Sequence, residues 1–176
     1  MTLKFILSIM MMGFFVTGYA CKCGGPGTVK ESYETTDLII YGRVASIDTV
    51  LLSETVTEED AKEVEEKLRG DQMLQYFKGT YVLRIGFEIV EKYKGQSDPA
   101  KAIIYTPWQR SACGFSFKKG KEYILYASTR NSFAFIFQKE NEGKIFKKEN
   151  TFWTTRCTRT AEYSKQEAEE LSLLKE

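Results

Sequence analysis

Histidine is absent from this chain of 176 residues. Its absence excludes the Ser-His-Asp and Cys-His catalytic arrangements, the HExxH zinc motif and histidine-based pH switching. An enzyme of another kind is not excluded, but the commonest general base is missing, so we predict a protein without enzymatic activity. An excess of charge is also lacking: 25 Lys and Arg are balanced by 24 Asp and Glu. Composition therefore gives no indication of nucleic-acid binding.

The N-terminal apolar run is too short to be a membrane anchor. It extends from Phe5 to Val16, about a dozen residues, whereas a helix that spans a bilayer needs about 20. Lys4 precedes the run, and Gly18 to Ala20 form a small-x-small ending. This order is typical of a secretory signal peptide. We therefore predict a signal peptide at residues 1–20, a single domain at residues 21–176, and an extracellular location, with a periplasmic one as the alternative.

Four cysteines follow the predicted cleavage site, at Cys21, Cys23, Cys113 and Cys157. An even number in an oxidising compartment indicates two disulfides. A four-thiolate zinc site is the alternative, but such sites usually contain C-x2–4-C pairs, and here there is one C-x-C and two single cysteines. Cys21 and Cys23 are too close to bond each other comfortably, so two connectivities remain open. We predict no metal of its own and no cofactor.

Alternating apolar residues predict a mainly β protein. Leu83, Ile85, Phe87 and Ile89 alternate with polar residues or glycine at period two. Gly42 within another strand suggests a bulge or bend. Further strands are expected at residues 38–47, 102–105, 123–127, 133–137 and 144–146, the last two as a hairpin around Asn141 to Gly143.

Two helices are predicted beside these strands. Ala61, Val64 and Leu68 have helical spacing in an inserted segment from Glu54 to Leu68. A closing helix should begin near Ser164, because Ser164 and Glu167 have the spacing of a capping box. The fold class is therefore expected to be an OB-fold-like, five- or six-stranded barrel with an inserted helix and a C-terminal helix.

Short motifs then occur in a familiar order. They are Cys21-Lys22-Cys23, Asp37-Leu38-Ile39-Ile40, Tyr93-Lys94-Gly95, Tyr105-Thr106-Pro107, Ser111-Ala112-Cys113-Gly114 and a single late Cys157. The ordered set resembles the N-terminal domain of the tissue inhibitors of metalloproteinases (TIMPs), within the netrin-like (NTR) family. The resemblance covers most of the mature chain and implies an OB barrel.

The resemblance also implies a function and a disulfide pattern. The implied pairs are Cys21–Cys113 and Cys23–Cys157. The implied partner is a zinc metalloendopeptidase, whose catalytic zinc would be chelated by the Cys21 amine and carbonyl oxygen. An α-amine has a pKa of about 7.7–8.0, so an unprotonated fraction exists at neutral pH. The implied inhibitory ridge contains Cys21, Lys22, Cys23, Gly24, Ser111, Ala112 and Cys113.

The chain departs from the TIMP pattern in several ways. Known inhibitors carry Ser or Thr where this chain has Lys22, and they have a further disulfide and a second domain. The insertion at Glu54 to Leu68 has no counterpart that can be matched. The alternative function is therefore a non-inhibitory extracellular NTR-type binding module. It could also be a lipoprotein anchored through Cys21, although Gly18 and Tyr19 fit a lipidation motif poorly.

Lysines near the predicted turns suggest one further partner. A polyanion, or another extracellular protein, could bind a basic patch, although a solvated turn surface is the simpler interpretation. The residues concerned are Lys118, Lys119, Lys121, Lys144, Lys147 and Lys148.

Overall fold

The computed structural model describes residues 23–70, 72–95, 98–108, 113–131, 133 and 148–175. The predicted signal peptide lies outside these residues, and so does the predicted hairpin of residues 133–146 apart from Phe133. Within the described residues, no helix is both long enough and apolar enough to cross a membrane.

The protein is mainly β, as the sequence predicts. Its strands form one six-stranded mixed sheet with the order β5-β3-β2-β1-β4-β6. Neighbouring strands are antiparallel except β3 and β5, which are parallel. The strands are β1 (Leu38–Leu51), β2 (Tyr81–Lys94), β3 (Ile103–Pro107), β4 (Glu122–Ala127), β5 (Thr151–Trp153) and β6 (Ala161–Glu162).

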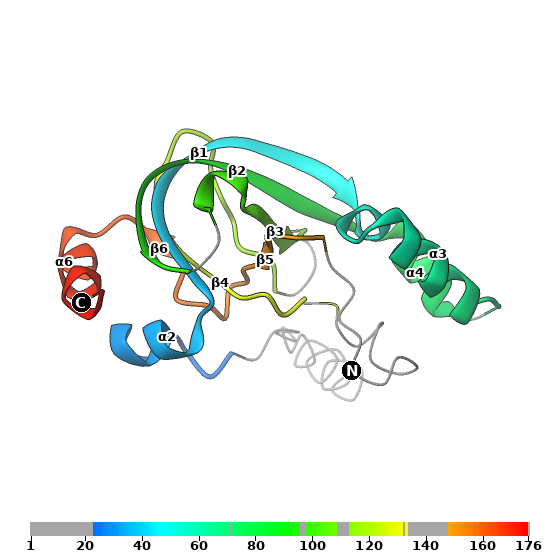
Figure 1. Ribbon diagram of the computed structural model, residues 1–176, viewed down its shortest axis with the longest axis horizontal. Coiled ribbons are helices and arrows are strands. Elements are labelled where there is room, and N and C mark those ends of the chain that lie inside the picture. The colour runs from blue at the N-terminus through cyan, green and yellow to red at the C-terminus, as the bar shows by residue number, and fades with distance from the viewer. Residues whose placement is uncertain are drawn as a thin grey trace, which may run out of the picture.

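The long, curved pair of β1 and β2 forms the main part of the sheet (Figure 1). The register shifts between Tyr41 and Gly42, which confirms the predicted irregularity at this glycine. A Cβ atom at Gly42 would lie 2.6 Å from the carbonyl oxygen of Glu88 in β2. Only glycine therefore allows the two backbones to approach so closely at the bend.

The sheet is not closed, so the predicted barrel is not confirmed. Beyond the end of β4, an isolated antiparallel bridge joins Ser128 to Trp153 of β5. Each residue donates its backbone N–H to the carbonyl of the other, at N···O distances of 2.9 and 2.7 Å. The edge of β5 is thus linked back to the β4 side of the sheet at one point.

The insertion between β1 and β2 is helical, but the single helix predicted from Glu54 to Leu68 is wrong in extent. A 3-10 turn, η1 (Leu52–Thr55), precedes α3 (Glu58–Lys67), and a second helix, α4 (Gln72–Gly79), follows it. The helix starts late because the Thr57 hydroxyl accepts the N–H of Asp60 at 3.1 Å and caps α3. A short η2 (Pro99–Lys101) lies before β3.

The terminal helices α2 (Val29–Thr35) and α6 (Lys165–Leu174) lie together, at the end of the molecule opposite α3 and α4 (Figure 1). The helix α2 was not predicted from the sequence, although Thr28 and Glu31 form a capping box at its start. The helix α6 was predicted correctly, but the capping box expected there is wrong. The Ser164 side chain makes no capping hydrogen bond, and the Glu167 carboxylate bonds Tyr126 and Arg159 instead of the Ser164 backbone.

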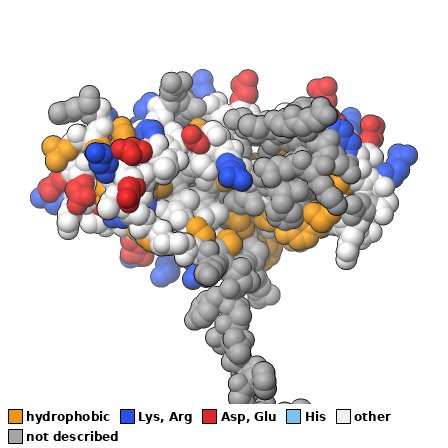
Figure 2. Space-filling view, turned by 90° about the horizontal axis from the view of Figure 1, so that it is seen from below, with side chains coloured by type: hydrophobic (Ala, Val, Ile, Leu, Met, Phe, Trp, Pro, Cys, Tyr) orange, Lys and Arg blue, Asp and Glu red, His pale blue; other side chains and the backbone are white. Residues whose placement is uncertain are grey.

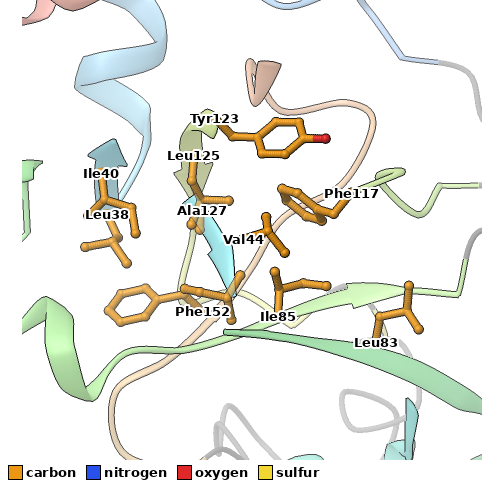
Figure 3. Close-up of a cluster of buried hydrophobic side chains, with 11 residues drawn as sticks. Leu38, Ile40, Val44, Leu83, Ile85, Phe117, Tyr123, Leu125, Ala127 and Phe152 are labelled. Carbon is orange, nitrogen blue, oxygen red and sulfur yellow. The ribbon is translucent and has the colours of Figure 1, made fainter. Parts of the chain in front are cut away.

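Apolar side chains from β1, β2, β3, β4 and β5 converge in the largest buried cluster of the described residues (Figure 3). Phe117, from the turn before β4, packs edge-to-face on Tyr123, with ring centroids 5.1 Å apart. A second cluster lies under η1, α3 and α4, and a third under α2 and α6. The period-two pattern of β2 is confirmed, since Leu83 and Ile85 are buried and Phe87 and Ile89 are partly buried against the same cluster, whereas Arg84 and Glu88 are exposed.

Candidate functional site

A disulfide holds the described start of the chain against a late loop. Cys23 is bonded to Cys157, 134 residues away, with a Cα–Cα distance of 5.1 Å. This confirms one of the two expected pairs and excludes the four-thiolate zinc alternative, because neither thiolate remains available. Cys113 is also disulfide-bonded. Its expected partner, Cys21, lies outside the described residues, so that pair stays a prediction.

The segment of Cys113 lies beside the same late loop. The carbonyl oxygen of Cys113 accepts the backbone N–H of Arg156 at 2.9 Å, next to Cys157. Three separate segments, which contain Cys23, Cys113 and Cys157, therefore meet at one place. Gly24 follows Cys23 and is exposed. The remaining residues of the expected ridge, Cys21, Lys22, Ser111 and Ala112, lie outside the described residues.

The strand β3 holds Cys113 in position through the residues that follow it. The backbone N–H of Phe115 donates to the hydroxyl of Thr106, a fully buried residue of β3, at 2.9 Å. Gly114 packs directly on the end of the same strand, and a Cβ atom there would lie 2.0 Å from the Pro107 carbonyl oxygen. The sequence motif contained Gly114, but only the structure shows why this position needs glycine.

Threonine hydroxyls stiffen the loop that carries Cys157. The Oγ1 atom of Thr154 lies 2.8 Å from that of Thr160 and 2.9 Å from that of Thr158. The Thr160 hydroxyl also bonds both the N–H and the carbonyl of Tyr126 in β4. The loop is thus ordered by its own side chains. No sequence pattern identified these threonines, because their partners become neighbours only in the folded chain.

An arginine links the late loop to the N-terminal segment and to α6. Arg159 donates to the Glu167 carboxylate at 2.8 Å and to the carbonyl of Gly27 at 2.6 Å. The Tyr126 hydroxyl donates to the same carboxylate at 2.7 Å. Burial, together with this bond to Glu167, raises the pKa of Tyr126, so the phenol remains a donor. The sequence spacing had instead suggested a helix cap for Glu167.

Replacing Arg159 with methionine should lower the free energy of unfolding by about 2 kcal/mol, the usual range for bonds to a charged group. The side chain keeps its apolar stem, but Glu167 and the Gly27 carbonyl lose their charged donor. Urea denaturation at pH 7 measures the loss. Arg156→Met, an exposed position in the same loop, is the control and should change stability by less than about 0.5 kcal/mol. Equal losses for the two variants would contradict this role of Arg159.

Of the six lysines that could form a basic patch, those that the structure describes do not lie together. Lys118, Lys119 and Lys121 lie at an exposed turn that bonds to Val44 through the Lys121 carbonyl. Lys148 instead donates to the carbonyl of Glu54, beyond the far end of β1, at 2.6 Å. Lys144 and Lys147 lie outside the described residues. The possible basic patch is therefore divided between two places in the described part of the chain, while a solvated turn surface is the simpler interpretation of the sequence.

Two further observations concern what the site could bind. Within the described residues, no group of three or more Cys, Asp or Glu side chains could hold a metal ion. A polar hollow of about 300 Å³ lies beside the disulfide, lined by residues that include Gly25, Pro26, Cys157 and Arg159.

Comparisons with protein-family models and with curated proteins find no match for this chain.

Proposed function

We propose that this chain is a secreted, TIMP-like inhibitor of zinc metalloendopeptidases, with its inhibitory group at the N-terminus freed by cleavage before Cys21. The observation that carries the proposal is the Cys23–Cys157 disulfide beside the Cys113 segment. It fixes a residue only two positions after the expected N-terminus. A short tip held by covalent bonds suits a group that must enter the active site of another protein.

The strand order supports an OB-type barrel as the underlying fold. The neighbours β1-β2-β3-β5 form a continuous series, and the Ser128–Trp153 bridge leads from β5 back toward β4 and β1. The apolar cluster in Figure 3 takes side chains from strands of this series and from β4. A five-stranded, partly open barrel is the form that the OB fold takes. The strand order therefore favours the fold that the TIMP resemblance implies, although the sheet is not closed.

In the proposed mechanism the tip acts through backbone atoms. The Cys21 amine and carbonyl oxygen bind the target's catalytic zinc and displace the water that the protease uses as its nucleophile. Disulfides at Cys23 and Cys113 hold the tip before binding, which reduces the ordering cost of association. Backbone ligands also explain how a chain without histidine can act on a zinc enzyme.

Extending the mature chain by one residue before Cys21 tests the chelation directly. The extension converts the α-amine into an amide, which cannot ligate zinc. Inhibition of a zinc endopeptidase should weaken at least tenfold, about 1.4 kcal/mol of binding. Thermal unfolding of both forms checks that the fold is unchanged. Equal potency of the native and extended forms would show that the amine is not the inhibitory group.

The Lys22→Thr variant tests the expected specificity of the tip. In the proposed mechanism the Lys22 side chain enters the main specificity pocket of the protease. Burying an unpaired ammonium in an apolar pocket is costly, so the native chain should prefer enzymes with an acidic or open pocket. Lys22→Thr should bind an apolar-pocket protease at least tenfold more tightly, about 1.4 kcal/mol. A titration in which the lysine form binds more tightly would refute this placement.

A non-inhibitory extracellular binding module is the second candidate function, and one observation favours it. Tyr81 is 50% exposed and Trp108 is 36% exposed, and their rings pack edge-to-face at 5.6 Å. Figure 2 shows hydrophobic side chains gathered on one face, toward the end where α3 and α4 lie. Exposed aromatic residues of this kind are typical of protein interfaces. Failure to inhibit any zinc endopeptidase in a panel would favour this function.

The chemical state of the N-terminus distinguishes the proposed inhibitor from a lipid-anchored protein. Intact-mass analysis of the exported protein reports the first residue, any attached lipid and the number of disulfides together. A mass that begins at an unmodified Cys21 with two disulfides would support the inhibitor. A lipid on Cys21 would block the amine and indicate an anchored binding module.

A further inference from the structure

A shallow cleft lies between α6 and the β1–β2 pair, at a place that the proposed inhibitor does not use. It has a volume of about 410 Å³, within the usual range for small-ligand sites. Its lining includes Tyr41, Tyr93, Tyr163, Glu91, Lys165 and Glu169. The cleft shares no residue with the disulfide-clamped N-terminal segment, so a ligand bound there would be independent of the proposed inhibition.

The aromatic side of the cleft is already ordered. The rings of Tyr41 and Tyr163 are stacked, with centroids 4.3 Å apart and an angle of 27° between their planes. Glu122 holds both residues: its carboxylate accepts the Tyr41 hydroxyl at 3.0 Å, and its carbonyl accepts the Tyr163 N–H at 3.0 Å. Tyr163 is nevertheless 38% exposed. It therefore offers a fixed aromatic surface to a ligand at little ordering cost.

The charged groups around the cleft neutralise one another. The Glu91 carboxylate lies 3.4 Å from the Lys175 ammonium, and the Glu169 carboxylate lies 3.6 Å from the Lys165 ammonium. Figure 2 shows acidic and basic side chains mixed at the end of the molecule where α6 lies. A charged ligand would thus meet no excess of the opposite charge. An entirely apolar ligand would in turn bury carboxylates and ammonium groups without new partners.

We propose that this cleft binds a hexopyranose unit of an uncharged glycan. One face of such a sugar ring presents C–H groups, which suit the exposed surface of Tyr163, while its edge carries hydroxyls. Hydroxyls both donate and accept, so they can bond the carboxylates of Glu91 and Glu169 and the ammonium of Lys165. Leu173, which is 76% exposed, extends the apolar rim on α6.

Backbone amide NMR of the intact, oxidised protein tests the proposal. The probes are four neutral trisaccharides, namely cellotriose, maltotriose, mannotriose and N-acetylchitotriose, each titrated to millimolar concentration. At least one should cause saturable shifts at Tyr41, Glu91, Tyr163 and the first turns of α6. The Tyr163→Ala variant should bind that sugar at least tenfold more weakly, whereas Tyr163→Phe should retain binding because the ring is kept.

Two controls make the result decisive. Tyr76→Ala removes an equally exposed tyrosine on α4 (41% exposed) and should leave sugar binding unchanged. If Tyr163→Ala fails to fold, Glu169→Ala on the exposed surface of α6 replaces it, with an expected loss of threefold or more. The proposal is overturned if no trisaccharide gives saturable shifts, if the shifts lie away from the cleft, or if a sulfated trisaccharide alone binds.

Discussion

Replacing Cys23 and Cys157 together with serine should lower the free energy of unfolding by about 4 kcal/mol. The disulfide closes a loop with a sequence separation of 134, and its loss returns that loop entropy to the unfolded chain. The chain-entropy treatment gives about 4.7 kcal/mol for a loop of 100 residues, and measured losses are usually about 2–5 kcal/mol. Because whole domains are stable by only about 5–15 kcal/mol, the variant should be folded but weakened.

The same variant should lose inhibition by more than its stability loss explains. Without the disulfide, the described contact of Arg159 with the Gly27 carbonyl still holds the N-terminal segment, but four residues further along the chain. The tip would then keep only the expected Cys21–Cys113 bond, and the residues between Cys21 and Gly27 would have to be ordered at the moment of binding. Urea denaturation at pH 7 measures stability, and inhibition is measured where the variant is fully folded. Lys119→Ala, in an exposed turn, is the neutral control.

A stability loss below about 1 kcal/mol would contradict this prediction, because it is well under the usual range for a native disulfide. It would mean that other contacts already order the N-terminal segment in the unfolded ensemble or that the native bond is strained. Unchanged inhibition by the folded double-serine variant would show that inhibition does not require the tip to be held by this disulfide. In that case the protein would still be an inhibitor, but its inhibition would not depend on the Cys23–Cys157 disulfide.

Gly114→Ala should cost about 3 kcal/mol, at the upper end of the usual cost of overpacking. The added Cβ would lie 2.0 Å from the Pro107 oxygen, 2.9 Å from the Pro107 carbonyl carbon and 3.0 Å from that of Trp108. All three atoms belong to the backbone, so no side-chain rotation can relieve the clash. The segment must move away from β3, which should break the Phe115–Thr106 hydrogen bond and displace Cys113.

Gly24→Ala is the matched control, because a Cβ at Gly24 would have no atom within 4 Å. Its stability should therefore stay close to that of the native protein. Backbone amide NMR should show shifts near Cys113 and Arg156 in Gly114→Ala but not in Gly24→Ala. If the two variants are equally stable, the 113–117 segment adjusts more freely than its packing on β3 implies.

Local patterns predicted some of the regular elements, but not α2, α4, β5 or β6. Alternation in Leu83 to Ile89 identified the centre of β2, and Gly42 marked the irregularity in β1. The apolar spacing near the C-terminus identified α6. These predictions succeed because backbone periodicity and glycine freedom act between residues that are neighbours in sequence. The pairing of Cys23 with Cys157 came from the TIMP resemblance and not from the residues alone, which left two connectivities open.

Other features needed the folded chain. Ser164 and Glu167 have the spacing of a capping box, but Arg159 and Tyr126 take the carboxylate instead, since a partly buried, charge-assisted bond is stronger than an exposed cap. Sequence alone also could not place Gly114 against Pro107. The atoms concerned are brought together by strand pairing and are not related by any local spacing.

The sequence by itself therefore determined the mainly β class, the bend at Gly42, the closing helix and the expectation of disulfides in place of a histidine-based site. Only the tertiary structure decided the parallel pairing of β3 with β5, the bridge from Ser128 to Trp153, and the meeting of Cys23, Cys113 and Cys157. The physical reason is the distance along the chain over which each effect acts. Propensity and periodicity act over a few residues, whereas each of these contacts joins segments whose proximity depends on the packing of the whole sheet.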